Sequence, residues 1–379
     1  MTSLKVIQVN TETIFLKKIY NLRRFFLAIV LCNLYLLADA QTRFVPFNDA
    51  GIQYQGRIVM DKDAAELSWS GTTVTLCFRG TNLSAILKDA DTADYYNVII
   101  DDKPILKIHT DTTRKKYLLA SGLTNTKHKA TLFKRTEWAL GKTRFYGFET
   151  SSATEVLPPP PLPERKIEFY GNSITCGYGM EDSSGNDSGQ GYFENNYLSY
   201  AAITARHFNA QYSCIARSGI GVMLSWFPLI MPEMYDRLDA TDSTSKWDFD
   251  QYTPDIVVIN LFQNDSWLIK MPQHAEFKHR FGTTAPGESF IVESYENFVK
   301  TIRSKYPGAY IICVLGNMDA TKQGVPWPGY VQKAVGNIND PKIFTHFFEY
   351  KNTGGHPKID EQQKMADSLI GFIESKINW

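Results

Sequence analysis

Short apolar runs alternate with turn signals along the first part of the chain. Between residue 41 and about residue 156, runs such as TVTLCFRG, LSAILKD and TRFYGFET are separated by polar segments, and no convincing amphipathic helix interrupts them. Regularly spaced short strands of this kind are typical of antiparallel sandwiches and jelly rolls. The pattern therefore predicts a jelly-roll-like β-sandwich domain over residues 41–156.

A proline-rich segment ends this pattern. Residues 157–164 read LPPPPLPE, and four consecutive prolines favour a stiff, extended spacer. We therefore expect a linker over 157–164 that joins two domains. The length of 379 residues is also about right for two domains.

From residue 165 to residue 379, apolar strand candidates alternate with helix-like stretches. Runs such as DIVVINL and AYIICVL are apolar on both faces of a strand, and the last stretch repeats apolar residues near helical spacing. This alternation predicts a parallel sheet covered on both faces, which is a three-layer α/β/α domain. The expected strands span 166–170, 210–215, 255–261, 309–315 and 343–348, and the expected helices lie near 197–208, 289–305 and 359–376.

Polar residues follow the ends of these strands, where ligands collect in parallel sheets. Ser173 follows the first strand in GNSIT, Gly219 follows the second in SGIG, and Asn264 follows the third in QND. His356 lies in the glycine-rich stretch TGGHP before the last helix. Each residue also has a structural interpretation: Ser173 as a helix cap, Gly219 as a turn residue, and Asn264 as a cap after its strand.

Together these residue types suit acyl transfer from an ester. A serine hydroxyl becomes a nucleophile when a base such as imidazole takes its proton. Backbone N–H groups and an amide side chain stabilise the oxyanion that follows, each donor contributing on the order of 3 kcal/mol. The motif around the serine is not the G-x-S-x-G elbow, because Thr175 stands where the last glycine would be.

The four blocks GNSIT, SGIG, QND and GHP, in this order, resemble those of SGNH (GDSL-type) hydrolases. More narrowly, EFYGNSITCGYG, ENNYLSYAAITAR and HPKIDEQQKMADSL are similar to carbohydrate esterase family 2. That family joins an N-terminal β-sandwich to an SGNH domain and removes acetyl groups from plant polysaccharides. The resemblance implies that Ser173 is the nucleophile and His356 the base. It also implies an oxyanion hole of Ser173, Gly219 and Asn264.

The chain departs from the SGNH pattern at two places. Asn172 replaces the usual aspartate before the serine, which affects local hydrogen bonding rather than the chemistry. The final block also lacks the aspartate that often precedes the histidine by two or three residues. We therefore predict a Ser–His dyad in which Nδ1–H of His356 bonds a main-chain oxygen of the 353–355 loop. Asp360 and Glu349 stay open as substitutes.

Aromatic residues near the blocks are candidates for stacking on a sugar ring. Trp267, Trp327 and Tyr178 are the predicted substrate-binding residues, although packing in the core is the alternative for each. The polar stretch MEDSSGNDSGQG at 180–191 is expected to form a loop at the rim of the crevice.

Composition limits the partners. Lys+Arg and Asp+Glu number 40 each, so no global charge attracts nucleic acid. The sequence shows no metal-ligand spacing and no phosphate-binding glycine motif, so we expect no metal and no cofactor. The four cysteines after the N-terminal segment lack C-x-x-C spacing, which argues against a zinc site. Export would allow some of them to pair, but Cys214 and Cys313 are in apolar runs where buried free thiols are usual, so a disulfide is not predicted.

The N-terminus is typical of an export signal. Two arginines precede the apolar run FFLAIVLCNLYLLA, and ADA at 38–40 offers a cleavage site. A membrane anchor is the alternative, but the run is shorter than a spanning helix usually needs. We therefore predict a signal peptide over 1–40 and a secreted or periplasmic protein without stable membrane association, acting as a monomer.

The sequence therefore predicts an exported serine esterase that acts on acetylated carbohydrate, of the xylan or mannan class. One alternative is a non-catalytic carbohydrate-binding protein on a decayed esterase scaffold, which the missing aspartate suggests. Another is an esterase for other small or lipid acyl groups.

Overall fold

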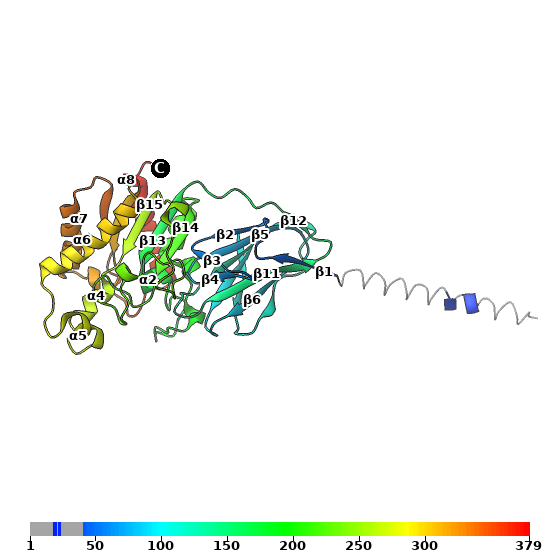
Figure 1. The fold of residues 1–379 in the computed structure, drawn as a ribbon, viewed down its shortest axis with the longest axis horizontal. Helices are drawn as coiled ribbons and strands as arrows, with labels where there is room; N and C mark the ends of the chain where they lie inside the picture. The colour runs from blue at the N-terminus through cyan, green and yellow to red at the C-terminus, as the bar shows by residue number, and fades with distance from the viewer. Residues whose placement is uncertain (1–17, 21, 24–40) are drawn as a thin grey trace, which may run out of the picture.

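The computed structural model describes residues 18–20, 22–23 and 41–379. In it a β-sandwich and an α/β domain lie side by side, and a long connection passes from one to the other (Figure 1). This agrees with the predicted fold class. The predicted signal peptide, 1–40, falls almost wholly outside the described residues. Among the described residues, no helix is long and apolar enough to span a membrane.

The sandwich consists of two six-stranded antiparallel sheets. One has the order β3-β4-β11-β6-β9 with β1 beside β11, and the other has the order β12-β5-β10-β7-β8 with β2 beside β5. Successive side chains of a strand point to opposite faces, so one face of each sheet fills the core between them. The strands are β1 (Thr42–Pro46), β2 (Ile52–Gln55), β3 (Ile58–Met60), β4 (Ala65–Leu67), β5 (Thr73–Gly80), β6 (Leu83–Asp89), β7 (Tyr95–Ile100), β8 (Lys103–His109), β9 (Lys115–Ala120), β10 (Thr126–Lys134), β11 (Thr143–Ser151) and β12 (Glu155–Leu157).

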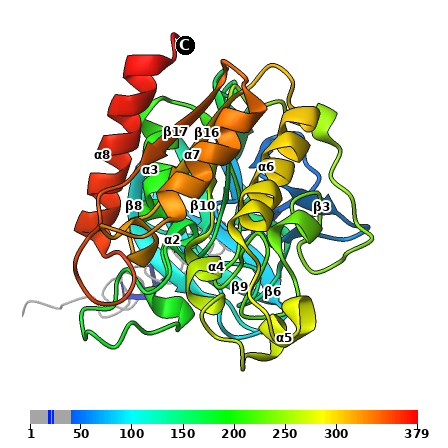
Figure 2. The same cartoon turned by 90° about the vertical axis from the view of Figure 1, so that its left-hand side faces the viewer.

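The α/β domain is built on a five-stranded parallel sheet of order β14-β13-β15-β16-β17. Helices α3 and α8 cover one face and helices α6 and α7 the other (Figure 2). The strands are β13 (Lys166–Gly171), β14 (Gln211–Ala216), β15 (Ile256–Asn260), β16 (Tyr310–Leu315) and β17 (Ile343–Phe347). The helices are α2 (Ser173–Cys176), α3 (Tyr200–His207), α4 (Gln263–Leu268), α5 (Ala275–Phe281), α6 (Glu288–Lys305), α7 (Trp327–Ile338) and α8 (Ile359–Lys376).

Burial explains why the apolar runs form this sheet. Every residue of β15 is buried, because helices pack on both of its faces. The expected strands and helices agree with the structure to within one residue at most ends. The main exception is α3, which begins at Tyr200 rather than at 197. Ser199 caps this helix by accepting a hydrogen bond from the N–H of Ala202, and a short 3₁₀ turn precedes it.

The proline-rich segment lies between β12 and β13 and is attached at both ends. The side-chain amide of Gln53 in the sandwich donates to the carbonyl of Pro160, and the amide of Gln211 in β14 donates to the carbonyl of Pro163. The segment therefore lies along the surface of both domains rather than hanging free.

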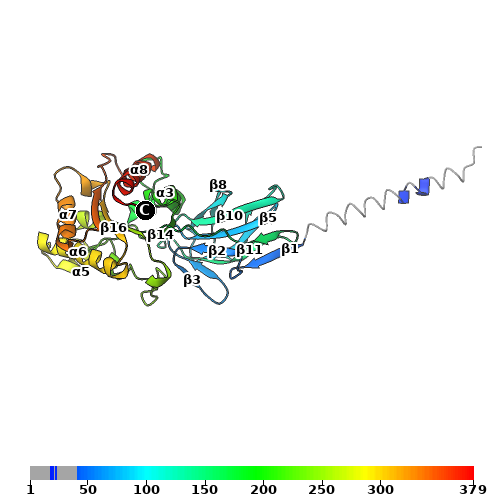
Figure 3. The same ribbon diagram turned by 90° about the horizontal axis from the view of Figure 1, so that it is seen from above.

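The sandwich packs against the edge strand β14 (Figure 3). The ring of Phe133, on β10, is stacked parallel to that of Tyr212, on β14, with centroids 6.5 Å apart. Gly71 lies so close to the same ring that a Cβ there would be 2.3 Å from it. Contacts this close give the two domains a defined relative position.

A buried ion pair joins the two domains beneath this edge. Arg57, in the turn between β2 and β3, lies 3.4 Å from the carboxylate of Glu168 on β13, and both side chains are fully buried. The hydroxyls of Tyr170, Tyr306 and Ser213 donate to the same carboxylate. The guanidinium also donates to the carbonyl oxygens of residues 235 and 237. Each charge in this cluster thus has several polar partners, as buried charges require.

Candidate active site

Ser173 is the first residue of the short helix α2, directly after β13. Asn172 caps this helix, because its side-chain oxygen accepts the N–H of Ile174 at 3.1 Å. The residue in place of the usual aspartate therefore serves the local turn, as predicted. Ser173 is only 5% exposed, so it is nearly buried.

His356 lies in the loop between β17 and α8, and its imidazole reaches Ser173. The Nε2 atom is 2.9 Å from Ser173 Oγ, which is hydrogen-bonding distance. The structure therefore brings together the two residues that the sequence proposed as nucleophile and base. Their loops come from opposite ends of the domain sequence but meet at the carboxyl end of the sheet.

Asp187 orients the imidazole, which corrects the prediction of a dyad held by a main-chain oxygen. Its Oδ2 atom accepts the hydrogen bond from Nδ1 of His356 at 2.7 Å, and its Oδ1 atom accepts the His356 backbone N–H at 2.8 Å. The carbonyl oxygens of Thr353 and Gly354 instead accept hydrogen bonds from Nζ of Lys351. The predicted substitutes, Asp360 and Glu349, make no hydrogen bond to His356 among the described residues.

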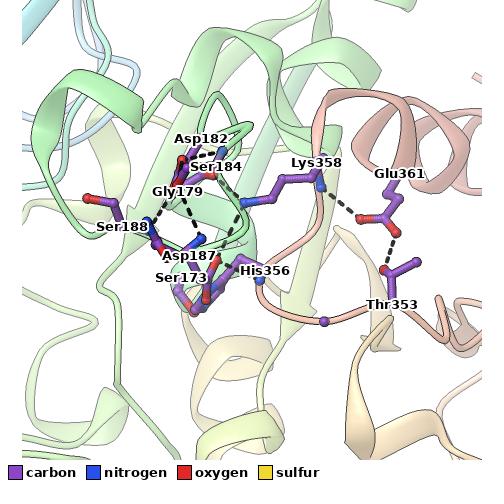
Figure 4. A network of polar contacts seen from close by, with 12 residues as sticks. Ser173, Gly179, Asp182, Ser184, Asp187, Ser188, Thr353, His356, Lys358 and Glu361 are labelled. Carbon is purple, nitrogen blue, oxygen red and sulfur yellow. Dashed lines mark hydrogen bonds and ion pairs between the residues drawn. The ribbon is translucent and has the colours of Figure 1, made fainter.

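The loop that carries Asp187 is held in a fixed shape (Figure 4). Asp182 accepts hydrogen bonds from the backbone and hydroxyl of Ser184 and from the N–H of Ser188. Lys358 reaches across from the start of α8, donates to the carbonyl of Gly179 and lies 3.6 Å from Asp187 Oδ1. The loop 180–191 was expected only at the rim of the crevice, but it supplies Asp187, which binds the catalytic candidate His356.

Two features of the backbone allow Asp187 to approach His356. Gly355 has a φ of +65°, and a Cβ at this position would lie 2.8 Å from the carboxyl carbon of Asp187. A glycine is therefore required directly before the histidine. Asp187 itself has a φ of +52°, a conformation that aspartate tolerates better than most residues. The glycines of TGGHP were a partial signal for this close contact, but they did not say which residue makes it.

The electrostatics of Asp187 suit its position. Partial burial alone would raise the pKa of this carboxyl, but the hydrogen bonds from His356 and the charges of His356 and Lys358 outweigh burial and hold it below its ordinary value. The carboxylate therefore stays ionised at neutral pH. An ionised acceptor keeps the proton on Nδ1 and leaves Nε2 free to accept the serine proton.

The predicted oxyanion donors follow the carboxyl ends of three neighbouring parallel strands, β13, β14 and β15. The N–H of Ser173 is the first of a helix and has no intrahelical acceptor. Gly219 has a φ of +83°, and among the described residues its N–H has no hydrogen-bond acceptor. The side-chain amide of Asn264 donates one hydrogen to the carbonyl of Ile220 at 2.8 Å, which leaves its second hydrogen for a ligand.

Asp265 holds the loop that follows Gly219. Its carboxylate accepts the N–H groups of Val222, Met223 and Leu224, at 3.1, 2.8 and 3.0 Å. Burial raises the pKa of this carboxyl to about 6, although the three N–H bonds oppose the rise. This agrees with a role in fixing the loop rather than in chemistry.

The aromatic residues around the site differ from the predicted set. The prediction that Trp327 stacks on a sugar is wrong, because its side chain is 3% exposed and makes edge-to-face contacts with Phe262 and Tyr330 in the core. Trp267 is half-buried, with its indole N–H bound to Asp319. Tyr178 lies against the imidazole of His356, with ring centroids 4.4 Å apart.

Trp226 is an aromatic residue of the site that the sequence reasoning missed. It is 43% exposed, and its indole N–H donates to Oδ1 of Asn264 at 3.1 Å. Its ring also lies beside Gly219, since a Cβ there would be 3.3 Å from Cδ1 of Trp226. Its place seven residues after Gly219 in the chain was the available signal.

This arrangement can activate a nucleophile and stabilise an anion. Asp187 keeps His356 in the tautomer that accepts a proton at Nε2, and Ser173 provides the proton and the attacking oxygen. The N–H groups of Ser173 and Gly219 and the second amide hydrogen of Asn264 are the kind of donor that stabilises a negatively charged oxygen. These are the parts required for acyl transfer.

Comparison with known families agrees with this chemistry. Residues 54–160 match the model of the carbohydrate esterase 2 N-terminal domain, and residues 169–340 match the GDSL-like lipase/acylhydrolase family. One match falls in each of the two domains seen in the structure.

Individual relatives share the whole two-domain arrangement. The chain is 36% identical over 356 aligned residues to the cellulase/esterase CelE of Acetivibrio thermocellus, and the match covers 90% of this chain and 41% of that longer protein. It is 24% identical over 357 residues to an acetylxylan esterase/glucomannan deacetylase of Cellvibrio japonicus, covering 92% of this chain and 95% of that protein.

A solved structure shows the same fold throughout. A family two carbohydrate esterase from Clostridium thermocellum, in complex with cellohexaose, superposes with a TM-score of 0.76 at 35% identity, covering 86% of this chain and 99% of that one. With this likeness, both family models and the arrangement of the site in agreement, the chain belongs to carbohydrate esterase family 2 and carries an SGNH-type hydrolase domain.

Proposed function

We propose that this chain is a serine esterase that removes O-acetyl groups from plant-type polysaccharides of the xylan or mannan class. The observation that carries the proposal is the hydrogen-bonded row of Ser173, His356 and Asp187 at the carboxyl end of the sheet. The relatives named as acetylxylan esterases and glucomannan deacetylases support the choice of substrate.

The reaction follows from the geometry. Ser173 Oγ attacks the acetyl carbonyl carbon while its proton passes to His356 Nε2. The carbonyl oxygen becomes an oxyanion and binds the donors of Ser173, Gly219 and Asn264. The sugar oxygen then leaves with the proton from His356, and the acetyl group stays on the serine. Water, deprotonated by the same imidazole, releases acetate and restores the hydroxyl.

The surroundings of the site support a carbohydrate rather than a lipid substrate. Trp226 presents a partly exposed indole beside the oxyanion donors, and one face of a sugar ring can pack on such a surface. The polar loop 180–191 also lies beside the site, because its residue Asp187 binds His356. A non-catalytic binding protein is less well supported than the sequence suggested, since Asp187 replaces the aspartate whose absence motivated that alternative.

Acetate release tests the proposal directly. Purified protein is incubated with acetylated xylan and acetylated glucomannan oligosaccharides, and free acetate is measured by NMR, with Ser173→Ala as the control. We expect release by the wild type and none by the variant. Binding of the oligosaccharides without release would favour the non-catalytic alternative. Faster cleavage of p-nitrophenyl octanoate than of p-nitrophenyl acetate would favour a lipid esterase.

Export remains part of the proposal. Of the segment predicted as a signal peptide, 1–40, only residues 18–20 and 22–23 belong to the part of the chain that the structure describes. A polysaccharide substrate requires contact with the medium or the periplasm, which fits an exported enzyme. N-terminal sequencing of the mature protein tests this point, and Gln41 is the expected first residue.

A further inference from the structure

One segment of the sandwich, residues 135–138 after β10, lies against the loops of the active site. The side chain of Arg135 donates to Glu181 at 2.6 Å and to the carbonyl of Glu194 at 3.2 Å. Its own carbonyl accepts the N–H of Asn196. The segment thus holds both ends of the loop that carries Asp187.

Glu137 reaches further, into the α/β domain itself. It is 4% exposed, and its Oε2 atom accepts the backbone N–H of Ser218 at 2.6 Å. The same atom lies 3.7 Å from Sγ of Cys176, which is in the helix that begins at Ser173. The N–H of Glu137 donates to the carboxyl of Glu194 at 2.6 Å. One carboxyl group of the sandwich therefore contacts two elements that supply oxyanion donors.

This carboxyl is costly to bury. Among the described residues it forms no ion pair, because the nearby guanidinium of Arg217 instead stacks on the rings of Trp138 and Phe227. Burial raises its pKa, although the Ser218 bonds and the charge of Arg217 oppose the rise. An apolar side chain would avoid this cost. Residues that break such a rule without a structural gain are found at functional sites.

We propose that Glu137 is a positioning residue that fixes the turn at Ser218 so that the next N–H, that of Gly219, points at the oxyanion. This inference rests on the proposed function. It makes the sandwich a working part of the active site rather than only a neighbouring domain. The physical reason is that a turn with left-handed φ at Gly219 can rotate its peptide groups, and one strong acceptor on the preceding N–H removes that freedom.

Kinetics of three variants test the inference. Glu137→Ala removes the acceptor, Glu137→Gln keeps an oxygen acceptor, and Glu155→Ala is a control at an exposed carboxylate of the same domain. With p-nitrophenyl acetate we expect Glu137→Ala to lower kcat by about 10- to 100-fold with little change in KM, as for a misplaced catalytic donor. Glu137→Gln should recover most of that loss, and Glu155→Ala should match the wild type.

A second readout separates positioning from mere stability. Diethyl p-nitrophenyl phosphate labels the serine: Ser173 Oγ bonds to phosphorus, p-nitrophenolate leaves, and the hydroxyl proton passes to His356. The final amount of label measures the number of folded active sites. The rate of labelling depends on how well the oxyanion donors are placed. We expect full labelling of Glu137→Ala at a reduced rate. A normal rate and normal kcat per labelled site would overturn the inference.

Two further outcomes are decisive. If Glu137→Ala does not fold, Glu137→Asp takes its place, because a carboxyl one methylene shorter should lose the Ser218 bond. A wild-type kcat in that variant contradicts the inference. If the wild type releases no acetate from any ester, the proposed function fails, but the labelling rates of the Glu137 variants still decide whether this residue positions the turn.

Discussion

Two acidic side chains of the α/β domain, Glu168 and Asp187, have opposite surroundings. Glu168 is fully buried under the domain interface and is bound by four different residues, of which Arg57 supplies the charge. Asp187 is on a loop with 26% of its side chain exposed, and both its oxygens bind one residue, His356. Glu168 has partners on several elements and so fixes the packing between them. Asp187 directs both of its hydrogen bonds to His356, with Lys358 as a more distant charge, and so fixes the position of that one residue.

The largest effect should follow the loss of Asp187. Without its carboxylate, the imidazole loses both its tautomer and its orientation, and Asp187→Ala should lower kcat by about 10⁴-fold. Stability should change little, because the residue is on an exposed loop. The measurement is kcat for p-nitrophenyl acetate, with Asp360→Ala as a nearby control. More than a tenth of wild-type activity would show that a main-chain oxygen can orient His356 after all.

The loss of Arg57 should lower stability and leave kcat nearly unchanged. Arg57→Met leaves Glu168 buried without its cation, which should lower the free energy of unfolding by about 3–5 kcal/mol. Urea denaturation measures this, and Arg79→Met, at an exposed ion pair, should cost less than about 1 kcal/mol. The kcat of molecules that remain folded should stay near that of the wild type. A large fall in kcat at unchanged stability would contradict the conclusion that Glu168 serves structure and Asp187 serves the reaction.

A variant of Asn264 tests a proposed oxyanion donor, whereas the Asp187 variant tests a group that orients the base. Asn264→Ala removes an oxyanion donor, and kcat should fall by about 10²- to 10³-fold, which corresponds to about 2.7–4 kcal/mol. The labelling rate with diethyl p-nitrophenyl phosphate should fall in parallel. Asn264→Asp is the matched variant, and it should be no more active than the alanine variant because it places an acceptor where a donor is needed. An unchanged kcat would remove Asn264 from the site.

The smallest effect is expected at Trp226. In the proposed function its partly exposed ring packs on a sugar ring and takes no part in the chemistry, so Trp226→Ala should raise KM for acetylated oligosaccharides by about threefold to tenfold. The KM for p-nitrophenyl acetate should change less. Trp226→Phe keeps a ring but loses the hydrogen bond to Asn264, so comparison of the two variants separates stacking from support of the amide. Equal changes for both substrates would argue against a sugar contact.

The sequence predicted the elements that repeat a pattern. Buried parallel strands such as β15 appear as continuous apolar runs, and their ends indicated Ser173, Gly219 and Asn264 as candidates because ligands bind beyond the carboxyl ends of such strands. His356 was found from its place in an ordered set of blocks. In each case the pattern that indicated the residue lies within a few positions of it in the sequence.

The partner of His356 could not be predicted in this way. Asp187 is separated from it by 169 positions and belongs to a polar loop without periodicity. The residues near the histidine in the sequence therefore do not include its partner, because the contact depends on how two loops fold over each other. Trp327 failed for a related reason: its ring belongs to the apolar face of α7, and a tryptophan near a motif does not reveal which way its ring points.

The stacking of Phe133 on Tyr212 also has a consequence for solubility. An open parallel sheet ends in strands whose outer N–H and C=O groups can recruit a strand from another molecule. Here β14 is such a terminal strand, and the sandwich is packed against it. The N-terminal domain therefore covers this edge of the sheet, and we expect its removal to expose a strand that can pair with other chains.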